Sequence, residues 1–177
     1  GRIFASASYR RDASSRFHPD HRWGNFWSVG AAWIMSRESW FNAPVFNMLK
    51  IKASVGSQGN DNIGDYLYTD MYNVTNDGND GIAISFARKG NPLITWETNT
   101  NINVGVEFGL WRDRLTGSVD LFNRITEDML FSVPVPPSLG YSSYIDNIGD
   151  MHNAGLEFNL TGDIFRTKNF TWTARVS

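Results

Sequence analysis

Aspartate and tyrosine side chains gather in one polar stretch of the sequence. Asp61, Asp65 and Asp70 stand there beside Tyr66 and Tyr68. A tyrosine ring can stack on a sugar ring while a neighbouring carboxylate accepts hydrogen bonds from the sugar hydroxyls, so this combination predicts a carbohydrate-binding surface. A solvated loop that packs on its own aromatic rings explains the same residues. Our candidate substrate-binding residues, all in loops, are Asp61, Asp65, Tyr66, Tyr68, Trp96, Tyr141 and Tyr144.

Three carboxylates could suggest hydrolytic chemistry, because glycosidases work with a pair of acidic side chains. Glu107, Asp120 and Glu157 fall on the polar face of predicted strands. We interpret them instead as charges on that face, which four basic residues can neutralise: Lys50, Lys52, Arg124 and Arg175. The sequence has no nucleophile elbow, phosphate loop or zinc-protease helix. We therefore assign no catalytic residue and expect that the chain is not an enzyme.

Two short segments resemble metal sites, and we interpret neither as one. The segment His18-Pro19-Asp20-His21 fits a polar loop without enforced ligand geometry. The segment Asp77-Gly78-Asn79-Asp80-Gly81 has its glycine at the wrong offset for a calcium loop, and the twelfth position is Arg88 rather than glutamate. A turn is the better interpretation of this segment. We expect no metal and no cofactor.

The elements that carry these residues are β-strands, because apolar and polar residues alternate with a period of two. The alternation is clearest at 98–110, where Ile102, Val104, Val106 and Phe108 lie on one face and Asn101, Asn103 and Glu107 on the other. The pattern predicts an all-β chain, an antiparallel meander of about seven strands. These strands are expected at 3–10, 24–35, 49–58, 98–110, 115–126, 155–161 and 171–176.

The connections between these strands differ in length. Long loops are expected at 11–23, 59–97 and 132–150, and shorter links at 36–47, 111–114 and 163–169. The link at 36–47 could hold a helical turn that starts at Ser36. Pairing Leu110 with Leu115 across the tight turn keeps apolar residues opposite apolar ones. In the last hairpin, matching of faces predicts Leu160 opposite Trp172.

Composition narrows the class of protein. Of the 177 residues, 19% are charged and 14% aromatic, and the formal net charge is -2, so nothing favours binding to nucleic acid. There is no cysteine. The longest apolar run, 31–35, is far shorter than the ~20 residues of a membrane helix. The sequence begins and ends within predicted strands, so we expect it to be part of something longer.

Pattern alone leaves two architectures open. The strand at 98–110 would be about 40 Å long, enough to cross a lipid bilayer when tilted. Aromatic residues lie near strand ends: Trp111, Phe165 and Phe170 by the short turns, and Trp23, Trp96 and Phe131 by the long loops. A transmembrane barrel has this arrangement. The alternative is a soluble β-sandwich that binds carbohydrate. The residues that would face lipid in a barrel, or a dry core in a sandwich, are Val104, Val106, Phe108, Val119, Leu121, Leu156, Phe158 and Leu160.

Several motifs favour the barrel. They stand in order along nearly the whole chain, at 9–17, 22–33, 49–60, 91–97, 122–130 with 133–137, and 145–157. One of them is Asn91-Pro92-Leu93-Ile94-Thr95-Trp96-Glu97, which precedes a predicted strand. Together these stretches resemble the SusC/RagA family of TonB-dependent outer-membrane transporters.

The resemblance implies a fold and a set of partners. Members of this family are large transmembrane barrels with an internal plug. They import glycans or peptides across the bacterial outer membrane, powered through TonB, and a SusD-like surface lipoprotein caps the barrel. We expect residues 1–177 to be a segment from the C-terminal half of such a barrel, without the plug through which TonB acts. The expected partners are the lipid bilayer, the remaining barrel and plug, the SusD-like lipoprotein, and an oligosaccharide or peptide ligand.

Overall fold

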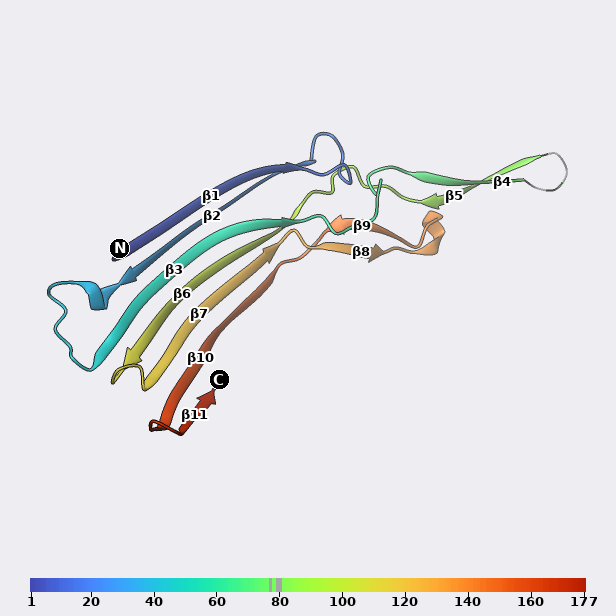
Figure 1. Cartoon of the computed structure of the whole chain (residues 1–177). Coiled ribbons are helices and arrows are strands. Elements are labelled where there is room, and N and C mark those ends of the chain that lie inside the picture. Colours follow the sequence, from blue (N-terminus) through green and yellow to red (C-terminus); the bar gives the residue numbers. More distant parts are fainter. Residues whose placement is uncertain (77, 79–80) are drawn as a thin grey trace.

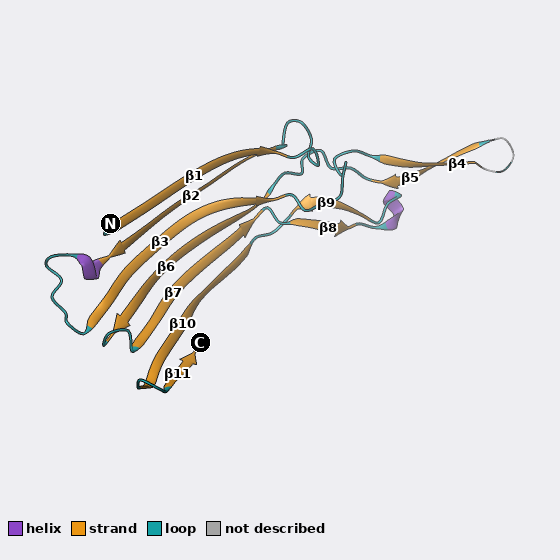
Figure 2. Cartoon of the chain, viewed as in Figure 1, coloured by secondary structure: helices purple, strands orange, loops and turns teal. Residues whose placement is uncertain are grey.

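The computed structural model describes residues 1–76, 78 and 81–177, so most of the turn predicted at 77–81 lies outside the described residues. Almost all of its regular structure is strand (Figure 2). The elements in chain order are β1 (Ile3–Ala13), β2 (Trp23–Ile34), η1 (Met35–Arg37), β3 (Phe46–Asn60), β4 (Met71–Asn76), β5 (Ile82–Arg88), β6 (Glu97–Leu110), β7 (Leu115–Glu127), β8 (Leu130–Pro134), η2 (Pro137–Leu139), β9 (Ser143–Asn147), β10 (Met151–Arg166) and β11 (Thr171–Val176).

Seven of these strands form one curved sheet in the order β1-β2-β3-β6-β7-β10-β11, and every neighbouring pair is antiparallel. The sheet is a single layer, with its long strands side by side and bent the same way (Figure 1). The predicted seven-stranded meander is therefore confirmed. In the described part of the chain, no helix has the length and apolar character needed to span a membrane.

The register keeps polar and apolar residues on opposite faces. Leu110 pairs with Leu115, as predicted, and Val106 pairs with Val119. On the polar face, Ser54 of β3 lies opposite Asn103 of β6. Because side chains alternate along each strand, this register builds one polar face and one apolar face over the whole sheet.

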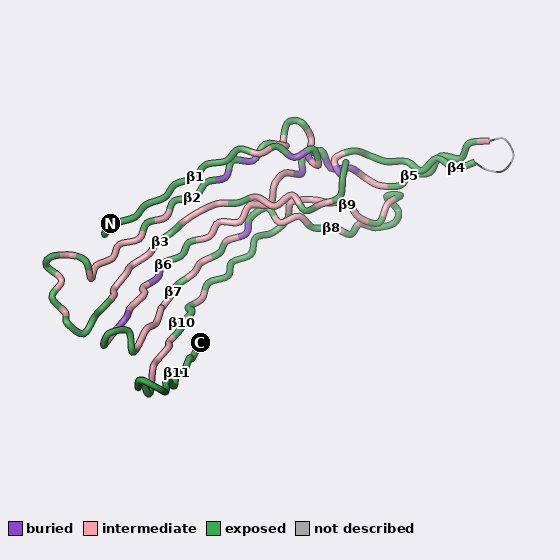
Figure 3. Tube along the Cα trace, in the orientation of Figure 1, coloured by how far each residue is buried: buried purple, intermediate pink, exposed green. Residues whose placement is uncertain are grey.

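The apolar face is bare. Val104, Leu121, Leu156 and Phe158 are 45%, 54%, 62% and 42% exposed. Figure 3 shows the long strands as exposed or intermediate along most of their length. A soluble sandwich would bury these side chains against a second sheet, and the described residues form no such layer. The structure therefore favours the barrel over the sandwich.

Two predicted loops contain strands that the sequence analysis did not assign. The interval 59–97 begins with the end of β3, holds the hairpin β4–β5, and ends with the start of β6. The interval 132–150 holds most of β8, the turn η2 and strand β9. Both hairpins extend beyond the same end of the main sheet (Figure 1). The helical turn expected at 36–47 is present as η1, one residue earlier.

The register of the last hairpin differs from the prediction. Leu160 pairs with Val176 and Trp172 pairs with Phe165, so the predicted pairing of Leu160 with Trp172 is wrong. Strand β10 continues to Arg166, further than the alternation suggested, and a bulge lies between Asp163 and Phe165. The bulge adds one residue to β10. Apolar residues therefore pair on both sides of it, Leu160 with Val176 and Phe165 with Trp172.

Two phenylalanine rings on the polar face lie over glycines of neighbouring strands. The Phe26 ring occupies the space in which a Cβ of Gly24 or Gly59 would stand. A Cβ at Gly155 would come 2.6 Å from Cζ of Phe122. Only glycine permits such close approach at these positions.

Candidate functional site

A small hydrophobic core lies where the strands end and the long connections begin. Phe17 and Ile94 are completely buried, and Leu67 is nearly so. These residues come from the β1–β2, β5–β6 and β3–β4 connections, which are far apart in sequence. We call this cluster of Phe17, Leu67 and Ile94 the rim core. The rim core packs three connections against one another, so the polar side chains of these connections are held in defined positions.

Trp96 belongs to the packing around this rim core. Its ring lies 5.5 Å from that of Phe17 and 5.2 Å from that of Phe26. Its indole Nε1 donates a hydrogen bond of 2.9 Å to the carbonyl of Arg22. The indole of this candidate residue is thus occupied on several sides by protein contacts, and its role in ligand binding stays a prediction.

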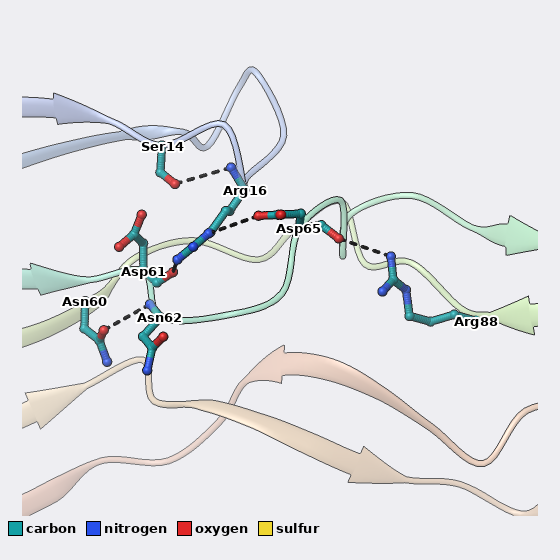
Figure 4. Close-up of polar contacts among 7 residues, drawn as sticks. All are labelled: Ser14, Arg16, Asn60, Asp61, Asn62, Asp65 and Arg88. Atoms are coloured by element: carbon teal, nitrogen blue, oxygen red, sulfur yellow. Dashed lines mark hydrogen bonds and ion pairs between the residues drawn. The ribbon is translucent and has the colours of Figure 1, made fainter.

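Two arginines fix the β3–β4 connection in place (Figure 4). Arg16 donates through Nη1 to the carbonyl of Asp61 at 2.8 Å, and through Nε to Oδ1 of Asp65 at 3.2 Å. Arg88 donates through Nη2 to the carbonyls of Asp65 and Tyr66 at 3.3 and 3.0 Å. These bonds tie the aspartates predicted from the sequence to the β1–β2 connection and to β5.

The aromatic candidates of this connection lie next to one another. The ring centroids of Tyr66 and Tyr68 are 6.3 Å apart, and His18 meets Tyr68 edge-on at 5.8 Å. Tyr66 is 60% exposed and has a φ of 56°. The structure therefore brings together Asp61, Asp65, Tyr66 and Tyr68, and adds Arg16, His18 and Arg88 to them.

A clasp of side-chain amides joins the β5–β6 connection to strand β9. Asn147 donates through Nδ2 to the carbonyl of Thr95 at 3.1 Å and accepts from the Thr95 amide at 2.8 Å. Asn91 donates to Oδ1 of Asp146 at 2.8 Å. Because Asn91 and Asp146 are at least half buried, these bonds satisfy groups that water cannot easily reach.

A second aromatic group joins the base of hairpin β4–β5 to the turn of hairpin β8–β9. Tyr141 packs at 5.9 Å from Phe86, which in turn meets Tyr72 edge-on at 5.3 Å. Nearby, Asp70 accepts a 2.8 Å bond from the Gly90 amide and a 3.0 Å bond from Lys89. The Gly90 amide, with the Lys89 ammonium, holds the pKa of Asp70 below its usual value, and the same ion pair raises the pKa of Lys89.

Tyr144 lies in β9 opposite Val133 of β8 and is half-buried. Among the described residues, no ring contact or hydrogen bond joins Tyr141 or Tyr144 to the Tyr66 group. The seven candidate residues thus fall into at least two places on the rim, and do not form one continuous site.

The carboxylates of the polar face form a short ion-pair ladder. Glu107 contacts Lys50 at 3.1 Å and Lys52 at 2.9 Å, and Lys52 also contacts Asp120 at 2.9 Å. Glu157 stands opposite Asp120 across β7 and β10. Arg124 and Arg175 donate to the neutral side chains of Asn101 and Thr161 instead. Pairing by the two lysines is confirmed, whereas the two arginines do not neutralise these carboxylates.

The side chain of His18 lies 3.3 Å from Oδ2 of Asp20, its neighbour in the loop. Within the described ranges, no three metal-ligating side chains converge. The sequence analysis missed the roles of Arg16 and Arg88, because each reaches backbone carbonyls more than twenty residues away. The sequence places neither arginine beside the aspartate-rich stretch, and only the pairing of the strands brings them there.

Sequence and fold comparisons agree with this architecture. A family model described as TonB dependent receptor-like, beta-barrel matches residues 1–177. The TonB-dependent receptor P39 of Formosa agariphila is 36% identical over 169 residues, covering 95% of this chain and 16% of that protein. The TonB-dependent receptor SusC of Bacteroides thetaiotaomicron is 34% identical over 180 residues, covering 97% of this chain and 18% of that protein.

Among solved structures, the RagAB peptide importer in its closed-closed state superposes with a TM-score of 0.91 at 33% identity, covering 98% of this chain and 19% of the matched chain. The open-open state of the same importer gives a TM-score of 0.88. The chain thus spans about a fifth of the length of the relatives it matches.

A single curved sheet with one polar face, one bare apolar face and structured loops at one end is a segment of β-barrel wall. The chain belongs to the family of TonB-dependent receptor β-barrels, and within it to the group that includes SusC and RagA.

Proposed function

We propose that this chain is a wall and extracellular-rim segment of a TonB-dependent importer in the bacterial outer membrane. Its apolar face contacts lipid, its polar face lines the lumen, and the rim with hairpins β4–β5 and β8–β9 faces the outside of the cell. The cargo is a glycan or a peptide. A SusD-like lipoprotein caps the rim, and TonB acts through a plug that these 177 residues do not include.

The observation that carries this proposal is the separation of the two faces. In β6, Ile102, Val104 and Val106 fall on one face, and Asn101 and Asn103 on the other, and the cross-strand register extends this division to the neighbouring strands. An exposed apolar surface of this extent is unfavourable in water and favourable in lipid. Our candidates for contact with cargo are Asp61, Asp65, Tyr66, Tyr68, Trp96 and Tyr141, which lie in loops, and Tyr144, which lies in β9.

The names of the relatives do not decide between a glycan and a peptide as cargo. RagAB is described as a peptide importer, and SusC as a TonB-dependent receptor. Both share about a third of their residues with this chain over the matched region. The residues that touch cargo lie in loops, where related barrels differ most.

Site-directed spin labelling can test the proposed faces. The chain has no native cysteine, so single cysteines can be placed at will. Ala53 and Ser54 are adjacent in β3, both small and both exposed on opposite faces of the sheet. In the full transporter, without other cysteines and in lipid vesicles, the label of Ala53→Cys should collide with oxygen, which is concentrated in lipid. The label of Ser54→Cys should collide with a water-soluble nickel complex.

A label at Ala53 that neither reagent reaches would mean that the apolar face is packed against protein, as in a soluble sandwich, and would reject the lipid-facing assignment. A label at Ser54 that reports lipid would reject the lumen assignment. The two positions serve as each other's control, because they share one strand and nearly one depth.

A further inference from the structure

Tyr66 is held in a conformation that its residue type disfavours. Its φ of 56° lies in the left-handed region, which costs a residue with a Cβ about 1–2 kcal/mol relative to the right-handed region. Glycine, asparagine or aspartate would occupy this position more easily. A large, exposed aromatic ring at a position that favours small residues indicates that the ring itself has a use.

The surrounding contacts hold Tyr66 outward. Leu67, the next residue, is buried in the rim core, and its carbonyl accepts a 2.9 Å bond from the Asn91 amide. Arg88 binds the Tyr66 carbonyl at 3.0 Å, and the Thr69 amide binds it at 3.1 Å. The next residue is anchored inside and the Tyr66 carbonyl accepts two bonds, so the backbone of Tyr66 is fixed where its ring is exposed to solvent.

A polar group of suitable chemistry lies beside this ring. Asp65 has a side chain that is 73% exposed, and its bond to Arg16 uses only Oδ1. Oδ2 can therefore accept a hydrogen bond from a bound molecule. Tyr68 and His18 continue the aromatic surface behind Tyr66. We call the surface formed by His18, Asp65, Tyr66 and Tyr68 the aromatic shelf.

The charges on the shelf favour a neutral ligand. Arg16 already neutralises Asp65, and Arg88 is turned toward backbone carbonyls and the sulfur of Met71. A peptide that adds as a strand needs open backbone groups. Here the carbonyls of Asp61, Asp65 and Tyr66 are already taken by the two arginines. A flat ring beside a carboxylate acceptor suits a sugar ring with its hydroxyls better than it suits a peptide.

We propose that the aromatic shelf is a binding subsite for a neutral oligosaccharide, on which Tyr66 stacks against a sugar ring and Asp65 accepts from its hydroxyls. This inference rests on the proposed function, because it identifies the substrate class of an importer whose cargo is otherwise a glycan or a peptide. It assigns the left-handed backbone of Tyr66 a purpose, which is to aim the ring outward from a rigid base.

The test is calorimetric binding to the full transporter in detergent, with a panel of neutral hexasaccharides of different linkage and a mixture of random decapeptides as probes. Binding of at least one hexasaccharide is expected. In Tyr66→Gly that affinity should fall about tenfold, the value of one good ring contact. Tyr66→Phe should keep the affinity. Tyr72→Leu, which removes a ring of the second aromatic group that is 58% exposed and is not one of the candidate residues, is the matched control and should also keep it.

Tyr66→Gly separates binding from folding. Glycine relieves the left-handed strain but loses more chain entropy on folding, and these two effects oppose one another, so the stability of the rim should change little. Unchanged hexasaccharide affinity in Tyr66→Gly, binding of the peptides alone, or binding of neither probe would overturn the shelf proposal. None of these results bears on the lipid-facing and lumen-facing assignments, which the spin-label experiment decides separately.

Discussion

A charge on the apolar face should cost far more than the same charge one residue away on the polar face. Val119 lies halfway along the apolar part of β7, four residues from Leu115 and four from Asn123. Its cross-strand partners are Val106 and Phe158, so an arginine there has no anion within reach on that face. At the middle of a bilayer, arginine on the lipid face of a barrel costs roughly 2–4 kcal/mol.

The matched control is Ser118→Arg, at nearly the same depth on the opposite face. Ser118 pairs with Glu107, so an arginine at this position gains an anionic neighbour and access to lumen water. A third variant, Tyr9→Arg, lies on the apolar face near its rim-side limit and should cost no more than about 1 kcal/mol. The three variants therefore differ in face or in depth, and each isolates one variable.

Urea unfolding of the full barrel in phosphatidylcholine vesicles measures these costs, with tryptophan fluorescence as the signal. Val119→Arg should shift the folding equilibrium by roughly thirtyfold to several hundredfold relative to the unsubstituted protein. Ser118→Arg should stay within about 0.5 kcal/mol, as is usual for surface changes. If Val119→Arg costs no more than Ser118→Arg, the apolar face does not meet lipid and the reasoning fails.

Three further predictions concern the rim. Ile94→Ala should destabilise the rim by about 2–5 kcal/mol, because the Ile94 side chain is fully buried. Leu93→Ala, at the exposed neighbouring residue, should have little effect. Hydrogen exchange of the rim amides measures both changes. Asn147→Ala should raise hydrogen exchange of the β9 amides while the amides of the long strands stay protected. If the β9 amides stay as protected as in the unsubstituted protein, the Asn147 side chain does not hold β9 in place. Because the Gly90 amide lowers the pKa of Asp70, their contact should contribute stability above pH 3.8 and lose it as pH falls through that lowered pKa. Exchange of the Gly90 amide reports this loss, and Asp70→Asn should abolish the pH dependence.

The sequence predicted the main sheet well, since each long strand has one apolar face and the alternation is therefore preserved. The pairing of Leu110 with Leu115 followed from that alternation together with a four-residue turn. The hairpin β4–β5 was missed, although Ile82, Ile84 and Phe86 alternate and a turn was predicted before them. This hairpin is short and does not pair with the main sheet, so its alternation does not continue that of any neighbouring strand.

The strand β8 was harder to recognise, because it ends at Pro134 and Pro136 and Pro137 follow, which interrupts any periodic pattern. The bulge in β10 could not be read from the sequence either, since nothing local distinguishes an extra residue from a longer strand. For the site, residue types alone selected Asp65 and Tyr66. The arginines that hold them act through carbonyl groups of distant residues, which leave no mark on the local pattern.

The glycines under Phe26 and Phe122 have a consequence for the lumen that we propose this face lines. Each ring fits against the backbone of a neighbouring strand because Gly59 and Gly155 have no side chain to lift it. These two large rings on the polar face therefore lie close to the backbone of the sheet. A methyl group at Gly155 would come 2.6 Å from Cζ of Phe122 and force that ring to move. If this face lines the lumen as proposed, these glycines help to set the width of the lumen without contributing charge.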